Sequence, residues 1–204
     1  MEYEQKVLSA LEEHRYLERG MLQKKIFKTK AGDRYAREVL LRMYQREMIS
    51  RFRCGRQEYI YHLGRKSQKW RHWLDLNHFH FSLLRDLKQW QKVIYWDYEV
   101  KYLYGVADAL YVLKLTLDNV GLSFFLEMDD GANKFDKIQK YMAYQQSKIW
   151  AKEWWGQAFP LVVVVTPRGE EIRELVRRCK AERFFRVLKK EKEYTNIIKQ
   201  IRGS

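Results

Sequence analysis

Two apolar runs with acidic residues near one end constrain the fold of this chain most. The first covers residues 107–113 (ADALYVL) and the second residues 122–131 (LSFFLEMDDG). Runs of this length, rich in branched and aromatic side chains, predict neighbouring strands of a small sheet. The carboxylates of Asp108, Glu127 and Asp129 then lie at strand ends, where side chains of neighbouring strands converge.

The turn between the two runs decides which acidic side chains share a face. We centre it on residues 118–121, so that residue 110 lies opposite residue 129. Because side chains alternate along a strand, Asp108, Glu127 and Asp129 are expected on one face. Such a cluster suits Mg²⁺ or Mn²⁺, which activate water for phosphodiester cleavage. The other interpretation, in which these acids cap turns or pair with lysines, stays open.

Charge is distributed unevenly along the 204 residues, whose net charge is +14. Residues 1–69 carry 17 Lys and Arg against 9 Asp and Glu, and residues 168–204 carry 12 against 6. The basic ends favour nucleic acid as the partner. We expect no membrane partner, since no apolar run approaches the roughly 20 residues of a spanning helix. The N-terminus has no signal-peptide pattern, so we expect a cytoplasmic protein.

The basic head has the pattern of a winged helix-turn-helix domain, residues 1–69. Three helices and two strands are expected, at residues 5–14, 17–26, 34–47, 49–54 and 58–63. Asp33 is the expected N-cap of the third helix, and Gly55-Arg56-Gln57 marks a hairpin. In this plan the third helix enters the major groove of DNA, and the hairpin, or wing, follows the backbone.

Basic side chains of the head are the predicted contacts to double-stranded DNA. They are Lys24, Lys25, Lys28 and Lys30 beside the groove, Arg34 and Arg37 on the third helix, and Arg51, Arg53 and Arg56 on the wing. Lysine and arginine provide most of the affinity for the phosphate backbone. A winged helix that binds protein instead remains the alternative.

The rest of the chain, residues 70–204, predicts a mixed sheet flanked by helices. The expected order is helix 70–90, strands 93–98, 109–117 and 122–129, helix 133–147, strand 161–165, helix 170–180 and strand 184–188. Residues 168–204 are expected to dock on this sheet as part of the same domain. His78 and His80 are two residues apart and point to different sides of a helix, which favours structural histidines over a zinc site.

This order resembles the restriction-endonuclease-like PD-(D/E)XK fold, in the α+β or α/β class. The resemblance implies that Asp108 and Glu127 hold a divalent metal and that a lysine positions or activates the attacking water. Here Ala107 stands where the motif has proline, and Asp129 where it has lysine. Some members supply the lysine from the neighbouring helix. The catalytic candidates are therefore Asp108, Glu127, Asp129 and Lys137, with Lys140 as the alternative lysine.

The whole chain also resembles the replication-relaxation proteins of Gram-positive plasmids and conjugative elements. After the winged helix, the shared segments are Asp108-Ala109, Glu127-x-Asp129-x-Gly131, Lys137-x-x-x-Tyr141 and Val165-Thr166-Pro167. The resemblance implies plasmid DNA replication, or DNA relaxation during mobilisation. A homodimer and contacts with replication or mobilisation proteins are further expectations.

Three functions remain open. The first is a metal-dependent nickase targeted by its winged helix. It is supported by the acidic residues Asp108, Glu127 and Asp129. The second is a non-enzymatic DNA-binding replication or regulatory factor with a degenerate nuclease-like scaffold, favoured by Ala107 and Asp129. A relaxase with tyrosine chemistry is a third, supported only by His78-x-His80.

Overall fold

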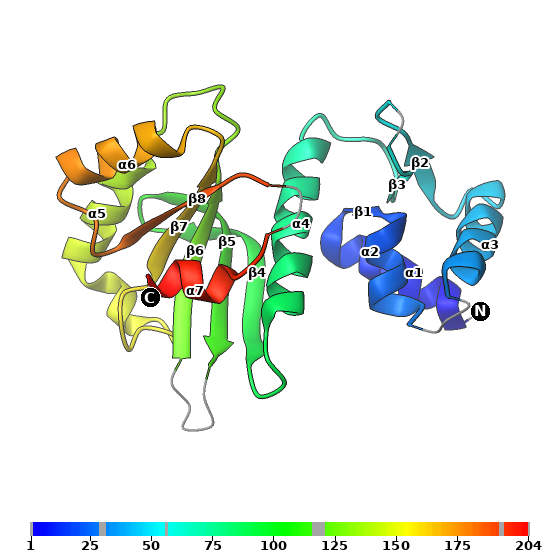
Figure 1. The fold of residues 1–204 in the computed structure, drawn as a ribbon, viewed down its shortest axis with the longest axis horizontal. Coiled ribbons are helices and arrows are strands. Elements are labelled where there is room, and N and C mark those ends of the chain that lie inside the picture. Colours follow the sequence, from blue (N-terminus) through cyan, green and yellow to red (C-terminus); the bar gives the residue numbers. More distant parts are fainter. Residues whose placement is uncertain (1, 29–31, 56, 116–120, 192–193, 204) are drawn as a thin grey trace. The chain divides into compact units, whose positions relative to one another are not determined.

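The computed structural model describes residues 2–28, 32–55, 57–115, 121–191 and 194–203. Helices and strands mix in an α+β arrangement, as predicted, and the chain divides into two units, Met1–Phe81 and Ser82–Ser204 (Figure 1). The division falls inside helix α4 (Trp70–Asp86), whereas the sequence indicated a boundary at its start. In the described part of the chain, no helix is long and apolar enough to cross a membrane.

The first unit combines helices with a small antiparallel sheet. Its elements before α4 are α1 (Glu2–His14), β1 (Tyr16–Glu18), α2 (Arg19–Ile26), α3 (Gly32–Gln45), β2 (Ser50–Phe52) and β3 (Ile60–His62). The strand order is β1–β3–β2. The strand β1 was not predicted, because its three residues are too few to show an alternating pattern and the last two fell within the predicted helix 17–26.

Helix α3 buries the apolar residues that recur at helical spacing in the sequence. Ala36, Val39, Leu40 and Met43 are all fully buried. The predicted N-cap is wrong: α3 begins at Gly32, and Asp33 lies within the first turn, paired with Arg37 at 2.6 Å. A Cβ atom at Gly32 would stand 2.1 Å from the carbonyl oxygen of Phe27, so only glycine fits this turn.

The second unit is built on a five-stranded mixed sheet, with strand order β4–β5–β6–β7–β8. Its strands are β4 (Lys92–Tyr102), β5 (Gly105–Lys114), β6 (Gly121–Met128), β7 (Leu161–Thr166) and β8 (Phe185–Lys189). The first three are antiparallel, and β7 and β8 join in parallel. Every predicted strand of this unit is present, which confirms the mixed sheet.

Helices α5 (Lys137–Ser147) and α6 (Gly169–Arg178) lie on one side of this sheet (Figure 1). Their buried side chains, among them Tyr141 and Ile172, pack against Phe125 and Val164 of the strands. A short 3₁₀ helix (Ile149–Lys152) follows α5. This packing fixes the start of α5 beside the carboxyl end of β6.

The register of β5 on β6 differs from the predicted one. Leu110 pairs with Phe125, and the same register places residue 108 opposite residue 127. The predicted turn was centred too late in the chain; residues 118–120 of it lie outside the described residues. Because the shift is an even number of residues, Asp108 and Glu127 still share a face, as predicted.

The C-terminal segment belongs to the second unit, as predicted. Strand β8 pairs with β7, and helix α7 (Ile197–Arg202) buries Ile197 and Ile201. The amide of Tyr194 donates to the Ser82 hydroxyl at 3.2 Å, and Arg85 donates to the Tyr194 carbonyl at 2.6 Å. The segment is therefore held by backbone pairing and by the end of α4.

Two of the buried histidines of the first unit, His14 and His80, lie next to each other. His14 is fully buried, with Nδ1 3.1 Å from the side-chain oxygen Oδ1 of Asn77 and Nε2 3.0 Å from Lys25 Nζ. The rings of His14 and His80 are 5.2 Å apart. Burial, followed by the charge of Lys25, lowers the pKa of His14 to about 4. These histidines pack in a core, in agreement with the structural role expected for His80.

We expect the first unit to lose stability in mild acid. Above about pH 6.5, the pKa of a histidine in the unfolded chain, His14 is neutral in both the folded and the unfolded state. As the pH falls from there towards 4, only the unfolded state binds a proton, so the free energy of unfolding decreases by up to about 3 kcal/mol. Denaturant unfolding of the wild type and of His14→Gln between about pH 7 and pH 4 measures this effect. Equal pH slopes for the two proteins would contradict it.

Candidate functional site

Glu127 is the centre of the candidate site. It lies near the end of β6 and only 1% of it is exposed. Lys137, the first residue of α5, donates a hydrogen bond from Nζ to Glu127 Oε2. One turn later, the Tyr141 hydroxyl donates to Glu127 Oε1 at 2.5 Å. Residues four apart share a helix face, so α5 delivers both donors to the same carboxylate.

Asp108 brings a second carboxylate to the same lysine. Its Oδ1 lies 3.6 Å from Lys137 Nζ, and its Oδ2 accepts a hydrogen bond from the Met128 amide at 2.7 Å. The amide contact ties the Asp108 side chain to the backbone of the strand that carries Glu127. The predicted pairing of Lys137 with the acidic cluster is thus present.

The electrostatics of the site are dominated by burial. Burial and then the charge of Asp108 raise the pKa of Glu127 to about 8, although Lys137 and Tyr141 oppose this. Burial would lower the pKa of Lys137, but the carboxylates of Glu127 and Asp108 raise it above its usual value. Lys137 therefore keeps its proton, and two neighbouring carboxyl groups share one cation. Below the pKa of Glu127 a proton neutralises this carboxylate, so a further cation would have to displace that proton.

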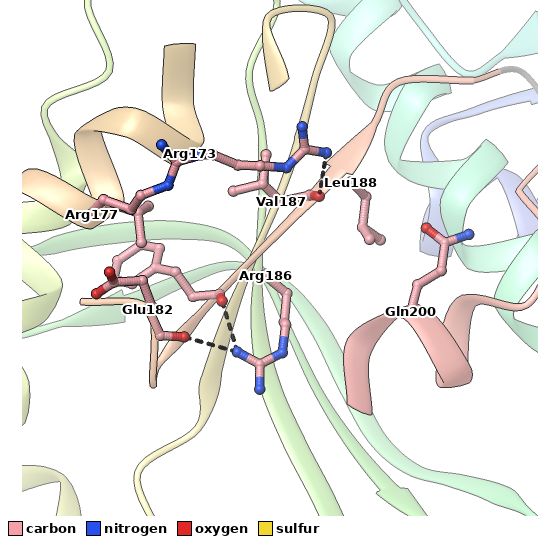
Figure 2. A pocket seen from close by; sticks show the side chains of 9 residues that line it. Arg173, Arg177, Glu182, Arg186, Val187, Leu188 and Gln200 are labelled. Carbon is pink, nitrogen blue, oxygen red and sulfur yellow. Dashed lines mark hydrogen bonds between the residues drawn. The ribbon is translucent and has the colours of Figure 1, made fainter. Parts of the chain in front are cut away.

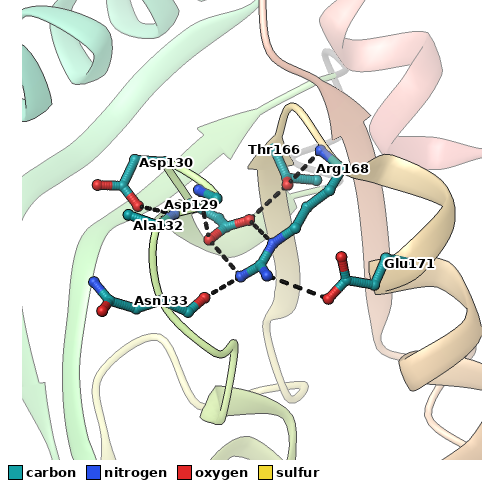
Figure 3. Close-up of polar contacts among 8 residues, drawn as sticks. Asp129, Asp130, Ala132, Asn133, Thr166, Arg168 and Glu171 are labelled. Carbon is teal, nitrogen blue, oxygen red and sulfur yellow. Dashed lines mark hydrogen bonds and ion pairs between the residues drawn. The ribbon is translucent and has the colours of Figure 1, made fainter.

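Asp129, the third predicted acid, contacts Thr166 and Arg168 rather than Lys137 (Figure 3). Arg168 Nε and Nη2 donate to its two oxygens at 2.9 and 3.1 Å, and the Thr166 hydroxyl donates at 2.6 Å. Burial would raise the pKa of Asp129, but these donors hold it below its usual value. Arg168 also donates to the Asn133 carbonyl. Asp129 therefore links the loop after β6 to the loop before α6.

The structure brings together Asp108, Glu127 and Lys137 and leaves Asp129 with Arg168. Within the described ranges, no group of three or more His, Cys, Asp and Glu side chains is placed to hold a metal ion. Sequence reasoning missed Arg168. A signal was available: Arg168 lies two residues after the end of β7, and the parallel strands β6 and β7 end at the same edge of the sheet.

A cavity of about 320 Å³ opens beside these residues. Glu127, Asp129 and Lys137 line it, together with Asn133 and Lys134 of the loop after β6. Mg²⁺ keeps several waters and needs only one or two protein carboxylates, but both Glu127 oxygens already accept hydrogen bonds from Lys137 and Tyr141, so a cation would have to compete with these donors. Asp108 and Glu127 are the residues that would hold it.

The predicted DNA contacts of the first unit fall into groups. Lys24 and Lys28 are exposed, whereas Lys25 pairs with Glu13 at 2.8 Å. On α3, the ion pairs are Arg34–Glu38 at 2.9 Å and Arg37–Asp33 at 2.6 Å. On the hairpin, Arg51 is half-buried and Arg53 is exposed. Lys30 and Arg56 lie outside the described residues. Exposed pairs such as these are weak, so the α3 arginines stay accessible to phosphates.

Another cavity, of about 310 Å³ and lined by arginines, lies along β8, the edge strand of the sheet (Figure 2). Arg177 pairs with Glu174, and the other two arginines are engaged with the backbone. Arg173 donates to the Val187 carbonyl at 3.5 Å, and Arg186 donates to the carbonyls of Phe185 at 2.8 Å and Glu182 at 3.0 Å. Charged side chains on an open edge prevent pairing with other strands.

Compared with family models, curated proteins and solved structures, the chain matches none.

Proposed function

We propose that this is a DNA-binding protein whose second unit holds one Mg²⁺ or Mn²⁺ and nicks or cleaves DNA. The observation that carries the proposal is the position of Lys137 against two carboxylates from adjacent strands. This grouping supports the resemblance to PD-(D/E)XK nucleases with the lysine supplied by the next helix. The replication or relaxation of plasmids or mobile elements is the proposed setting.

The order of elements in the first unit supports DNA binding. It runs α1, β1, α2, α3, β2 and β3, with β1 added to the β2–β3 hairpin. This order supports the proposed winged helix, in which α3 would be the recognition helix and the hairpin the wing. Exposed Arg34 on α3 and Arg53 at the hairpin then face the duplex.

In the second unit, each side chain has a distinct role in this proposal. A divalent cation would polarise the phosphodiester and lower the pKa of a bound water. Asp108 and Glu127 would hold the cation. Lys137 would keep its proton and orient the water beside Glu127. Tyr141 would fix the Glu127 carboxylate by its hydrogen bond.

A second candidate function is a non-enzymatic DNA-binding replication or regulatory factor. A specific observation favours it: Arg168 engages both oxygens of Asp129, so the third acid is not free for a cation. In this case Lys137 neutralises Glu127 permanently, and the second unit is a scaffold. Both functions need DNA binding, and they differ in metal binding and strand cleavage.

We expect the full-length protein to bind duplex DNA with an affinity that falls steeply with salt. Each phosphate contact adds about 0.9 to the slope of log affinity against log salt. Replacing Arg51 and Arg53 by Gln should therefore reduce the slope by about 2. Fluorescence polarisation of a labelled duplex measures both. Arg178→Gln, an exposed arginine of the second unit, is the matched control. An unchanged slope in the double variant would contradict the predicted wing contacts.

A further inference from the structure

Two tyrosines stack on the arginines of the hairpin. The guanidinium carbon of Arg51 lies 4.2 Å from the ring centre of Tyr44 and 4.1 Å from that of Tyr59. The guanidinium carbon of Arg53 lies 3.8 Å from the Tyr59 ring. All three distances are within the range of a cation–π contact. We call Tyr44, Arg51, Tyr59 and Arg53 the wing stack.

The wing stack joins three elements of the first unit. Tyr44 lies in the last turn of α3, Arg51 in β2, and Tyr59 directly before β3. Tyr44 is 41% exposed, so the stack lies at the surface. It therefore connects the proposed recognition helix with the proposed wing.

The stacked arginines differ from those of α3 in their partners. Arg34 and Arg37 each pair with a carboxylate, whereas Arg51 and Arg53 have no ion pair among the residues that the structure describes. A ring does not neutralise the guanidinium charge, so both arginines keep their charge for a phosphate, although Arg51 also forms a side-chain hydrogen bond with Tyr61. The planar fork of a guanidinium matches phosphate oxygens.

We infer that Tyr44 and Tyr59 are positioning residues that hold Arg51 and Arg53 ready for phosphates of the DNA backbone. This inference rests on the proposed function. An arginine that is ordered before binding loses less side-chain entropy when a phosphate docks. Tyr59 matters most, because its ring contacts both arginines. The alternative is that the tyrosines only pack the hairpin, where Tyr59 and Tyr61 have ring centres 6.3 Å apart.

Conservative and non-conservative variants of the full-length protein test this inference. Tyr59→Phe keeps the ring, so its affinity for a labelled duplex should stay within about twofold of wild type. Tyr59→Leu removes both stacks and should bind about three- to tenfold more weakly. Its salt slope should be unchanged, since no charge is lost. Tyr44→Leu, which removes a single stack on an exposed residue, should show a smaller loss and provides the test if Tyr59→Leu does not fold.

A double-mutant cycle separates positioning from packing. In a protein with Arg51 and Arg53 replaced by Gln, Tyr59→Leu should cause no further loss of affinity. The inference is overturned if Tyr59→Leu, folded by circular dichroism, binds as wild type, or if its effect is undiminished in the arginine-free background. Absence of duplex binding by the wild type is a different result: it contradicts the proposed function itself and this inference with it.

Discussion

Lys137→Met is expected to lower the free energy of unfolding by about 3 to 5 kcal/mol at alkaline pH. The change removes the cation that contacts Glu127 and Asp108 and leaves a carboxylate that is 1% exposed without compensation. Breaking a buried ion pair from one side is costly, because the remaining charge has lost both water and partner. Urea denaturation of both proteins measures the difference.

The pH dependence of this loss follows from the pKa of Glu127. Its folded pKa of about 8 lies above the unfolded value, so folding binds a proton between these two pH values. Stability from such a group is full at low pH and is lost as the pH rises through the folded pKa. Without Lys137 the folded pKa is higher still. The loss caused by Lys137→Met should therefore be smallest near pH 5 and grow towards pH 9.

A matched control lies in the same helix. Lys140 is exposed and pairs with Asp136 at 2.7 Å. Lys140→Met should cost less than about 1 kcal/mol, as exposed pairs do. A Lys137→Met protein as stable as Lys140→Met at every pH would contradict the role given to Lys137. It would also remove the observation that carries the proposed function.

The affinity for Mn²⁺ is expected to rise about tenfold per pH unit from pH 6 towards the Glu127 pKa of about 8, and then to level off. The reason is that the cation needs the ionised carboxylate, whereas burial favours the protonated one. Calorimetric titration of the full-length protein at several pH values measures this dependence.

Substitution of the ligands defines the site. Glu127→Gln should weaken Mn²⁺ binding by about 100-fold or more near pH 8, because several kcal/mol of ligand energy are lost. It should also abolish the pH dependence. Asp97→Asn, which changes an exposed acid of β4, is the control and should bind as wild type. Binding by Glu127→Gln with wild-type affinity would place the metal elsewhere.

Much of the second unit was predictable, because its strands are long and apolar. The β5–β6 register was wrong, because it was derived from the position of a turn at residues 118–121, whereas the pairing of the described strands differs from it by four residues. The face shared by Asp108 and Glu127 was still correct, since alternation depends only on whether the shift is even. The alternation of side chains along the strands was therefore sufficient to predict that these two carboxylates share a face.

The fate of Asp129 was not predictable from alternation. The position of its side chain is set by its contact with Arg168, which lies in a loop far away in the sequence. The partners of the hairpin arginines were equally hidden, since the contact of Tyr44 with Arg51 depends on how α3 meets β2. Contacts of this kind are set by tertiary packing, and the periodicity of one segment carries no information about them.

The cleavage of supercoiled plasmid is the most direct test of the central claim. With Mg²⁺ or Mn²⁺, the wild-type protein should convert supercoiled plasmid to nicked or linear DNA. Asp108→Asn should reduce this rate by about 100-fold or more while duplex binding is retained. Unchanged plasmid topology at millimolar Mn²⁺, by a protein that binds the same DNA, would contradict the proposed cleavage and leave the non-enzymatic DNA-binding factor as the function.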